Sequence, residues 1–291
     1  MNQYVAQLPW TDEQWARVTK TVKQEAERTR VAAKFLPIYG PVGEDQVAVP
    51  NLALSETGIA PLVPAAAAAV PGLSRRRLDV DSSPQTALAT ISMLVYVRGH
   101  EASDPELQAA LTMFRRAANI LARTEDALMF NGQADVNEKP VAPGGAIDLA
   151  QVTYGRPQNG LVGSDLGPNL PDGHQARRVR IPQRAGLVAG QALIEAVVDA
   201  IDRLEQQGYG GPYACVLAND LYRDAHTPTD NLVLPRHTIV PMLEDGPLLR
   251  SSTIKDGWGI VVSRDSGQVE QVLASEICVK FLHVSEEPRF V

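Results

Sequence analysis

The stretch SDPELQAALTMFRRAANILARTEDALMFNG, residues 103–132, predicts one long helix around which the rest of the chain must be arranged. Ser103 and Glu106 form a capping box at its start, and Pro105 lies in the first turn, where its missing N–H costs nothing. The predicted helix reaches about Phe130 and is roughly 40 Å long at 1.5 Å per residue. Its apolar residues lie on more than one side: Leu107, Leu111, Met113, Phe114, Ala118, Ile120, Leu121, Leu128 and Met129. Such a helix must be covered on several faces, as the spine of a domain or at an interface.

A second amphipathic helix is expected near the N-terminus. Thr11 and Gln14 form another capping box, and the helix is predicted to run to about Phe35, before Pro37 ends it. Its apolar stripe is Trp15, Val18, Val22 and Ala26. The turn GPVG at 40–43 joins this helix to the body of the protein.

Residues 45–80 are unusual for a compact domain. Residues 47–50 predict a short strand, but the prolines around the alanine run at 65–69 exclude a central strand. The alanines are also too few to hold an isolated helix. The segment is therefore either a flexible loop, which composition alone favours, or an arm that becomes ordered only against a neighbouring chain.

The remaining segments predict a mixture of helices and strands. Residues 87–97 are expected to form a long, largely buried strand, residues 133–185 a surface insertion, and residues 186–207 a third helix capped by Gly208. Further along, a short helix is expected at 219–224 and a Pro-punctuated loop from 225 to 246. Strands are expected at 213–217, 248–254, 259–263, 269–273 and 277–284. This order indicates an α+β fold with mixed sheets.

Composition excludes several classes of function. The formal net charge is −7, whereas a protein that coats nucleic acid needs concentrated Lys and Arg. The start of the chain does not resemble a secretion signal, and no apolar run reaches the roughly 18 residues of a membrane span. We therefore expect a soluble, cytoplasmic protein without a nucleic-acid or membrane partner. Cys215 and Cys278 are expected to be buried free thiols, and a basic cluster is interpreted as a solvated loop: Arg177, Arg178, Arg180 and Arg184.

Chemical motifs are scarce. The sequence has no phosphate-binding loop, dinucleotide fingerprint or nucleophile elbow. His226 and His237 lie in one predicted loop with Asp224 and Asp230, where ordinary surface histidines are favoured over a metal site. The pair Glu125–Asp126 cannot converge on one atom, because neighbours on a helix point about 100° apart. We therefore predict no catalytic, cofactor or metal site, and no enzymatic activity.

Several segments, in order along nearly the whole chain, resemble encapsulin shell proteins, which are also known as linocin-like bacteriocins. The segments that carry the resemblance are DEQWARV at 12–18, IYGPVG at 38–43, EDALMFNG at 125–132, GL at 160–161, QGYGGPYACVL at 207–217 and DLY at 220–222. Each is weak alone, and their common order gives the resemblance its strength.

The resemblance implies a tailed-phage major capsid fold with a peripheral domain, an extended arm and an axial domain. It also implies an icosahedral shell, self-assembled from many copies of the chain, that encloses a cargo enzyme such as a ferritin-like protein or a peroxidase. The implied division is an N-terminal helix and turn on the inner wall at 1–44, the arm at 45–80, a peripheral domain with the spine helix at 81–135, an insertion at 136–185, the axial domain at 186–265 and a return to the peripheral domain at 266–291.

In this family the cargo carries a short targeting peptide that docks on the inner wall near the first helix. Carried over by position, the docking candidates are Val31, Lys34, Phe35, Leu36 and Ile38. They would form an apolar groove for an extended peptide, although Phe35, Leu36 and Ile38 can equally serve to pack the helix onto the body. Loop 225–247 is the candidate for the lining of a pore, with four candidate residues: His226, Asp230, Arg236 and His237.

The sequence departs from the family at three places. Ala32, Ala33 and Pro37 stand where relatives have Gly, Arg and Asp, which leaves the cargo and the docking mode open. The stretch between Gly132 and Gly160 is longer than usual. The family also continues beyond the position of the last residue here into a final strand, so whether the C-terminus is complete stays open.

Two other interpretations remain. The chain could be a phage or prophage major capsid protein, although such proteins often carry a long N-terminal scaffolding region and this sequence begins directly with the capped helix. It could also be a cytosolic α+β enzyme of unknown reaction.

Overall fold

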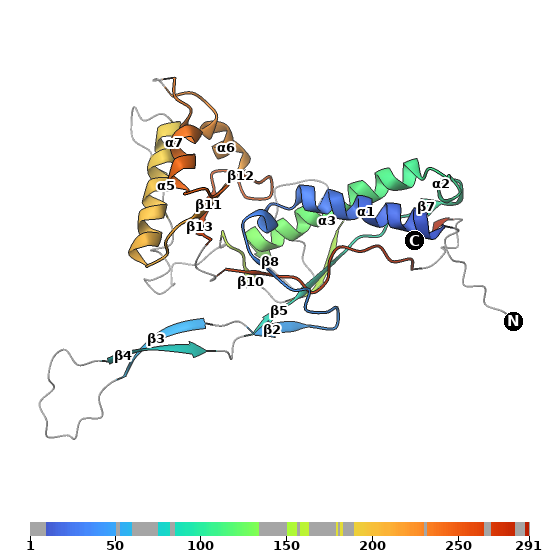
Figure 1. Ribbon diagram of the computed structural model, residues 1–291, viewed down its shortest axis with the longest axis horizontal. Helices are drawn as coiled ribbons and strands as arrows, with labels where there is room; N and C mark the ends of the chain where they lie inside the picture. Colours follow the sequence, from blue (N-terminus) through green and yellow to red (C-terminus); the bar gives the residue numbers. More distant parts are fainter. Residues whose placement is uncertain are drawn as a thin grey trace, which may run out of the picture.

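The structure is a computed structural model that describes residues 10–50, 53–59, 75–81, 85–133, 150–155, 158–162, 179, 181–182, 189–229, 232–264, 269–282 and 289–290. Figure 1 shows two units and a ribbon that extends away from both. The spine unit is built on α1 (Asp12–Thr29) and α3 (Gln108–Asn131). The sheet unit comprises the described residues between 189 and 264, and the ribbon is formed by β3 (Ala53–Ile59) and β4 (Arg75–Asp81).

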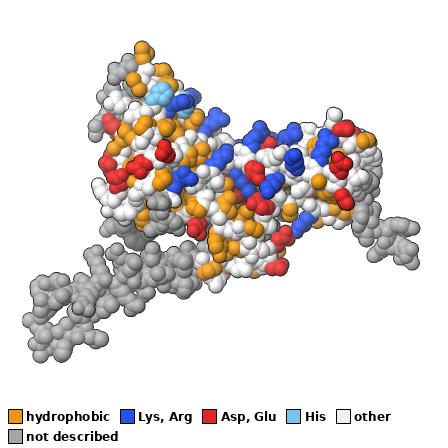
Figure 2. Space-filling view, viewed as in Figure 1, with side chains coloured by type: hydrophobic (Ala, Val, Ile, Leu, Met, Phe, Trp, Pro, Cys, Tyr) orange, Lys and Arg blue, Asp and Glu red, His pale blue; other side chains and the backbone are white. Residues whose placement is uncertain are grey.

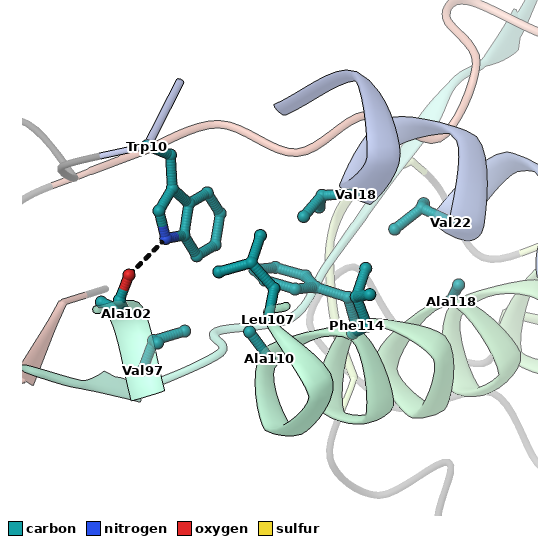
Figure 3. Packing of buried hydrophobic residues seen from close by; sticks show 10 residues of the cluster. Trp10, Val18, Val22, Val97, Ala102, Leu107, Ala110, Phe114 and Ala118 are labelled. Carbon is teal, nitrogen blue, oxygen red and sulfur yellow. Dashed lines mark hydrogen bonds between the residues drawn. The ribbon is translucent and has the colours of Figure 1, made fainter. Parts of the chain in front are cut away.

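The spine unit is held together by an apolar contact between α1 and α3. The two helices run in the same direction, because Arg17 on α1 contacts Glu106 just before α3 and Val31 contacts Asp126 near the end of α3. Figure 3 shows the side chains that fill the contact, together with the indole N–H of Trp10, which donates to the carbonyl oxygen of Ala102 at 3.0 Å. These buried residues are Trp10, Val18, Val22, Val97, Ala102, Leu107, Ala110, Leu111, Phe114 and Ala118. Burying a large apolar side chain of this kind contributes about 1.5–3 kcal/mol.

Both helices of the spine unit differ in length from the prediction. The capping box of α1 is confirmed, since the Gln14 N–H donates to Thr11 Oγ1 at 3.3 Å and the Thr11 N–H donates to Gln14 Oε1 at 2.9 Å. However, α1 ends at Thr29 rather than near Phe35, because Arg30 has an extended backbone with ψ 126°, and only a short 3-10 helix, η1 (Ala32–Lys34), follows.

The spine helix α3 begins at Gln108, later than predicted. Leu107 has a left-handed backbone with φ 50°, which separates α3 from the short helix α2 (Gly99–Ala102). Asp104, not Ser103, caps the start, since its carboxylate accepts from the backbone N–H groups of Glu106 and Gln108, each at 3.0 Å. The predicted burial on several sides of the helix is confirmed by the buried residues Ala110, Leu111, Phe114, Ala117, Ala118, Ile120, Ala122, Thr124, Asp126, Ala127 and Phe130.

The ribbon is an antiparallel pair whose register runs from Ala53 opposite Asp81 to Ile59 opposite Arg75. It continues from the short pair β2 (Ala48–Pro50) and β5 (Gln85–Ala87), which confirms a strand near 47–50. The flexible-loop interpretation is therefore wrong for 53–59 and 75–81. The alanine run and its flanking prolines lie outside the described residues.

The prediction of one long, buried strand at 87–97 is wrong. The segment is divided among β5, β6 (Ala89–Ser92) and β7 (Val97–Arg98). Each of the three pairs with a different partner: β2, β9 (Gln151–Tyr154) and β15 (Arg289–Phe290). Among residues 85–97 only Val97 is buried, and Leu94 and Tyr96 are 51% and 49% exposed. The apolar run at 87–97 therefore does not form a single buried strand.

The described part of the predicted insertion 133–185 makes one close turn against α3. Strands β8 (Gly132–Gln133) and β10 (Gln158–Asn159) pair antiparallel. The N–H groups of Leu161 and Val162 then donate to Met129 and Phe130 at 2.9 and 2.8 Å. A Cβ on Gly160 would collide with the carbonyl oxygen of Phe130, so only glycine fits this approach. None of the four arginines of the basic cluster lies in the described part of the chain.

The sheet unit has the predicted mixed sheet. Strand β11 (Tyr213–Leu217) lies in the centre, parallel to β12 (Leu248–Arg250) and antiparallel to β13 (Gly259–Ser263). The strand at 213–217 forms as predicted, and all its residues are buried. Helices α5 (Ala189–Gln206), α6 (Asn219–Ala225) and α7 (Pro235–Met242) cover one face of the sheet, with buried contacts from Leu193, Val197, Ile201, Leu221, Ile239 and Leu243.

Helix α7 corrects the predicted loop at 225–246. Pro235 occupies the first turn, where no backbone N–H is needed, and Ile239 and Leu243 are completely buried against the rest of the sheet unit. Pro235, which was interpreted as part of a loop, therefore begins a short helix. The predicted end of α5 is confirmed, because Gly208 follows it with φ +86°.

The C-terminal segment forms less strand than predicted. Only β14 (Gln271–Val272) forms within 269–273, and residues 277–282 contain no regular strand. Both cysteines are free, as expected, but only Cys215 is buried, and Cys278 is exposed. No helix in the described ranges is both long and apolar enough to cross a membrane.

Candidate docking segment and its supports

The docking segment, residues 31–38, lies where the spine unit meets the sheet unit. Phe35 and Leu36 are 2% and 4% exposed. Phe35 stacks on Phe130 of α3, with the ring centroids 6.3 Å apart and the planes within 4°. The remaining residues of this apolar cluster come from the back of the mixed sheet and the turn before β13: Ala214, Val216, Ala218, Ile254 and Ile260. Two of the five docking candidates therefore also fix the segment to both units.

Asp126 determines the course of the backbone at the start of this segment. Its carboxylate accepts from the Val31 N–H at 3.0 Å (Oδ1) and 2.9 Å (Oδ2), and from the Ala32 N–H at 2.9 Å (Oδ1). These N–H groups have no helical partner once α1 ends, so the carboxylate takes the role of a helix cap from 95 residues away in the sequence. The interaction stabilises the backbone just after α1, at the start of η1.

Glu125, the neighbour of Asp126, makes a separate contact. It accepts from Arg30 Nε at 2.9 Å and from the side-chain amide of Gln271 on β14. Arg30 is 5% exposed and also donates from Nη1 to Glu276 Oε2 at 3.2 Å. The two carboxylates thus have different partners, which confirms that they do not converge on one atom. Together they connect α1, α3 and the C-terminal segment.

Burial changes the acidity of both carboxyl groups. It raises the pKa of Asp126 to about 7, against the opposing effect of the two backbone N–H donors. It also raises the pKa of Glu125, although Arg30 and Gln271 favour the charged form. The side chains that support the docking segment therefore titrate closer to neutrality than ordinary carboxyl groups do.

The docking segment ends in a small sheet. Strand β1 (Ile38–Tyr39) runs parallel to β14, with the Gln271 N–H donating to the Pro37 oxygen at 2.8 Å and the Leu273 N–H to the Tyr39 oxygen at 2.9 Å. Among the described strands, β1 and β14 pair only with each other, which leaves the outer edge of each without a strand partner in that part of the chain. Ile38 and Tyr39 are 44% and 58% exposed. An extended peptide could add to such an edge.

A hollow of about 410 Å³ adjoins the segment. It is lined by Ala33, Lys34, Phe35, Leu36, Pro37, Pro212 and Arg264. Of the predicted docking residues, Lys34 is exposed and donates from Nζ to the Arg28 oxygen at 3.0 Å, whereas Val31 is half-buried. The lining thus combines apolar side chains with two cationic ones, Lys34 and Arg264.

A second, narrower groove of about 90 Å³ lies in the spine unit. This peripheral groove runs between α1, α3 and two segments, 93–97 and 277–282. Leu94 and Leu282 on its rim are 51% and 59% exposed. The sequence did not point to this groove, because its walls come from four separate segments.

Three of the four predicted pore residues lie in the described part of the sheet unit. His226 follows α6, and its ring lies 4.3 Å from that of Tyr222, while its Nδ1 is 2.8 Å from the Tyr222 oxygen. Arg236 and His237 are exposed in the first turn of α7, and Asp230 lies outside the described residues. The described residues contain no group of three His, Cys, Asp or Glu side chains placed to hold a metal ion.

Sequence reasoning did not find the supports of the docking segment. Asp126 and Glu125 were noticed only as a possible catalytic pair, and their partners lie 94 to 146 residues away. One signal was available: Asp126 stands on a helix whose apolar residues predict burial on several sides, and a buried carboxylate needs hydrogen-bond donors.

The fold defines a class of protein. The solved structure of a virus-like particle from Pyrococcus furiosus superposes on the chain with a TM-score of 0.54 at 11% identity, covering 96% of this chain and 90% of that one. With its long spine helix, ribbon and mixed-sheet unit, the chain has the α+β fold of tailed-phage major capsid proteins.

Sequence relatives identify the family. The type 1 encapsulin shell protein EncA of Myxococcus xanthus is 25% identical over 296 residues, which cover 96% of this chain and 86% of the relative. A diheme-cytochrome–encapsulin shell fusion protein of Kuenenia stuttgartiensis is 23% identical, over 92% of this chain and 64% of the fusion. The family model Linocin_M18, described as encapsulating protein for peroxidase, matches residues 2–141 and 176–288. The chain therefore belongs to this family, the encapsulin shell proteins.

Proposed function

We propose that this chain is the protomer of a cytoplasmic, icosahedral nanocompartment that encloses a cargo enzyme such as a ferritin-like protein or a peroxidase. The observation that carries the proposal is the family match over residues 2–141 and 176–288, which includes both the spine helix and the whole sheet unit. Membership of a shell-protein family fits a structural role, with the chemistry performed by the cargo.

The ribbon supports assembly. Strands β3 and β4 pair only with each other in the described part of the chain, and they extend away from both units (Figure 1). A two-stranded ribbon is marginal alone in water, and further packing is what makes such a pair stable. A neighbouring copy of the chain supplies that packing in a closed shell.

The cargo docks through a targeting peptide that binds the hollow beside the docking segment, with Val31, Lys34, Phe35, Leu36 and Ile38 as the residues that form or support the site. The hollow suits a peptide with an apolar side chain next to an acidic group, because Lys34 and Arg264 stand beside apolar walls. The free edge of β1 provides backbone donors and acceptors for the extended part of the peptide.

Binding of the cargo terminus tests this docking site. The co-purifying protein is identified by mass spectrometry, and its terminal segment is used as a labelled peptide against the assembled shell. We expect Lys34→Glu and Arg264→Glu to weaken binding, and Lys20→Glu, an exposed cation on α1, to leave it unchanged. If Leu94→Asp and Leu282→Asp abolish binding instead, the peptide occupies the peripheral groove and the hollow is not the docking site.

Small substrates pass through gaps at the symmetry axes, with His226, Asp230, Arg236 and His237 at the pore lining. The exposure of Arg236 and His237, and the position of His226 directly after α6, support this assignment. Replacing both histidines by alanine is expected to change the rate at which enclosed cargo turns over a charged substrate. The free cargo enzyme provides the reference rate.

Particle size tests the proposal as a whole. Size-exclusion chromatography and negative-stain microscopy of the purified chain are expected to give closed, megadalton particles. A monomer or dimer would exclude a shell and favour the cytosolic enzyme, for which loss of turnover on changing a loop histidine is the further test. Dependence of assembly on a phage protease would favour the phage or prophage capsid alternative.

A further inference from the structure

Asp126 is a buried carboxylate at the start of the docking segment. It is 2% exposed, and its hydrogen-bond partners are two neutral backbone N–H groups, those of Val31 and Ala32. Within the described residues it forms no ion pair. Burial disfavours the charged form of a carboxyl group, and a cation in contact is what ordinarily offsets that effect. The surroundings of Asp126 therefore favour its protonated form more than those of an ordinary carboxyl group do.

The hydrogen bonds of Asp126 connect it to the wall of the hollow. Ala32, which donates to Asp126 Oδ1 at 2.9 Å, is the first residue of η1, and the next two residues, Ala33 and Lys34, line the hollow. The carbonyl oxygen of Ala32 also accepts from the Leu36 N–H at 2.9 Å. The carboxylate is thus bonded to the same short turn that presents the cationic side chain of Lys34 to the hollow.

The charged groups around Asp126 come from α1, α3, the docking segment and the C-terminal segment. Lys34 favours the charged form of Asp126, and Glu125, its neighbour on α3, disfavours it. Arg30, directly after α1, is occupied by two other carboxylates, Glu125 Oε2 at 2.9 Å and Glu276 Oε2 at 3.2 Å. Three carboxyl groups therefore share the cations Arg30 and Lys34, and Asp126 is the one that has no ion pair among the described residues.

The surface above Asp126 is basic around the hollow. Lys34 lines the hollow from the docking segment and Arg264 from the sheet unit, and both are exposed. Figure 2 shows further Lys and Arg side chains along the visible face of the spine unit, interspersed with Asp and Glu. Histidine is the side chain that ordinarily changes its charge between about pH 5 and 8, and no histidine of the described part lines the hollow. A change of charge at the hollow in that range therefore has to come from another group.

We infer that cargo docking is coupled to a proton on Asp126, so that an acidic group of the targeting peptide binds the hollow more tightly when Asp126 is neutral. This inference rests on the docking site proposed above and concerns the regulation of that site. The reason is electrostatic, because an ionised Asp126 repels an acidic group beside Lys34 and competes with it for the same cation. The coupling is reciprocal, so a docked acidic group favours protonation of Asp126 by the same factor.

The titration of Asp126 determines the pH range and the sign of the effect. Burial raises the pKa of Asp126 to about 7, so its charge changes mainly between about pH 6 and pH 8. Below this range Asp126 is neutral, and Lys34 is free to attract the peptide. As the pH rises through the range, Asp126 loses its proton and the affinity for an acidic peptide falls. Burial also raises the pKa of Glu125, where the charge change has the same sign but is offset by Arg30.

Peptide binding to the assembled shell, measured as a function of pH, tests this coupling. The probe is the labelled terminal segment of the co-purifying cargo, with any histidine replaced by glutamine so that the peptide itself does not titrate in this range. Fluorescence anisotropy at constant ionic strength gives the Kd at each pH. For the wild type we expect Kd to rise at least about fivefold from pH 6 to pH 8, which is the lower end of ordinary coupling between two sites.

Two changes, one in the protein and one in the peptide, should each remove this dependence. Asp126→Asn keeps an oxygen acceptor for the backbone N–H groups but has no charge at any pH, so it is expected to bind at pH 8 about as tightly as the wild type does at pH 6. Replacing the acidic residues of the peptide by their amides leaves the protein unchanged and is also expected to flatten the pH profile. Asp224→Asn, in the sheet unit, is the matched control and should keep the wild-type dependence.

The outcomes separate the coupling from the docking site. An equal Kd at both pH values for the wild type would overturn the coupling and leave the docking site intact. A wild-type pH dependence that persists in folded Asp126→Asn, or with the amide peptide, would overturn it as well, and so would a cargo peptide that docks without any acidic residue. Failure of the peptide to bind the shell at either pH would overturn the docking site itself. If Asp126→Asn does not assemble, the amide peptide decides.

Discussion

Removing the carboxylate of Asp126 should release the start of the docking segment. In Asp126→Ala the N–H groups of Val31 and Ala32 lose their acceptor, and Ala32 is 1% exposed, so its N–H has little access to water. A buried donor without a partner costs about 1–3 kcal/mol, so two donors predict a loss of about 2–6 kcal/mol. The loss should concentrate at the junction of α1, α3 and β14.

The pH dependence separates the hydrogen bonds of Asp126 from its charge. Burial raises its pKa from 3.8 to about 7, so between these pH values the folded state holds a proton that the unfolded state has released. The unfolded state binds fewer protons there, and the free energy of unfolding therefore falls as pH rises from about 4 to about 7. Above about 7 the decrease stops. The part between pH 5 and 7 is worth roughly 3 kcal/mol, at 1.36 kcal/mol for each pH unit.

Asp126→Asn is the matched variant, because its amide oxygen can still accept while its charge is absent at every pH. Relative to this variant, the wild type is expected to lose stability from pH 5 to pH 8, whereas the hydrogen-bond deficit of Asp126→Ala persists at low pH. The assembled shell is heated while the fluorescence of its tryptophans is followed. Hydrogen exchange of residues 30–38 reports the local effect.

Two results would refute this reasoning. Unchanged exchange of the docking segment in Asp126→Ala would show that the carboxylate does not hold it. Parallel pH profiles for the wild type and Asp126→Asn would show that Asp126 does not titrate near neutral pH. Asp224→Asn, a change of the same kind in the sheet unit, serves as the control for general effects of lost charge.

Three further predictions concern packing, backbone and thiol chemistry. Phe35→Ala should lower the free energy of unfolding by about 3–5 kcal/mol, because the ring is 2% exposed and stacks on Phe130; thermal unfolding of the shell measures the loss, and a midpoint like that of the wild type would contradict the packing. Gly160→Ala should destabilise the turn onto α3, because a Cβ would collide with the Phe130 oxygen, whereas Gly99→Ala meets nothing within 4 Å and should be tolerated in the same assay. In the unassembled chain, maleimide should modify Cys278 and spare Cys215, because Cys278 is exposed and burial raises the pKa of Cys215 to about 12; mass spectrometry of the labelled peptides decides, and faster labelling of Cys215 would contradict the fold.

The resemblance to encapsulins could be recognised without the structure, because it rests on short segments in a fixed order. The stretch proposed for cargo docking could also be named from the sequence, since its five candidate residues lie within residues 31–38. The packing around these residues could not be read from the sequence. Phe35 and Leu36 are buried, as expected if they pack the helix onto the body, whereas Lys34 and Ile38 are exposed.

Local sequence patterns were enough to determine those elements whose stabilising contacts lie within a few residues of one another. The capping box of Thr11 and Gln14, the end of α5 at Gly208 and the buried strand β11 all depend on neighbours in the sequence. Long-range contacts decided the rest. The backbone just after α1 depends on Asp126, and the division of residues 87–97 depends on three separate strand partners. The physical reason is the same in both: a backbone N–H or a strand edge is satisfied by a group far along the chain, which only the tertiary structure brings near.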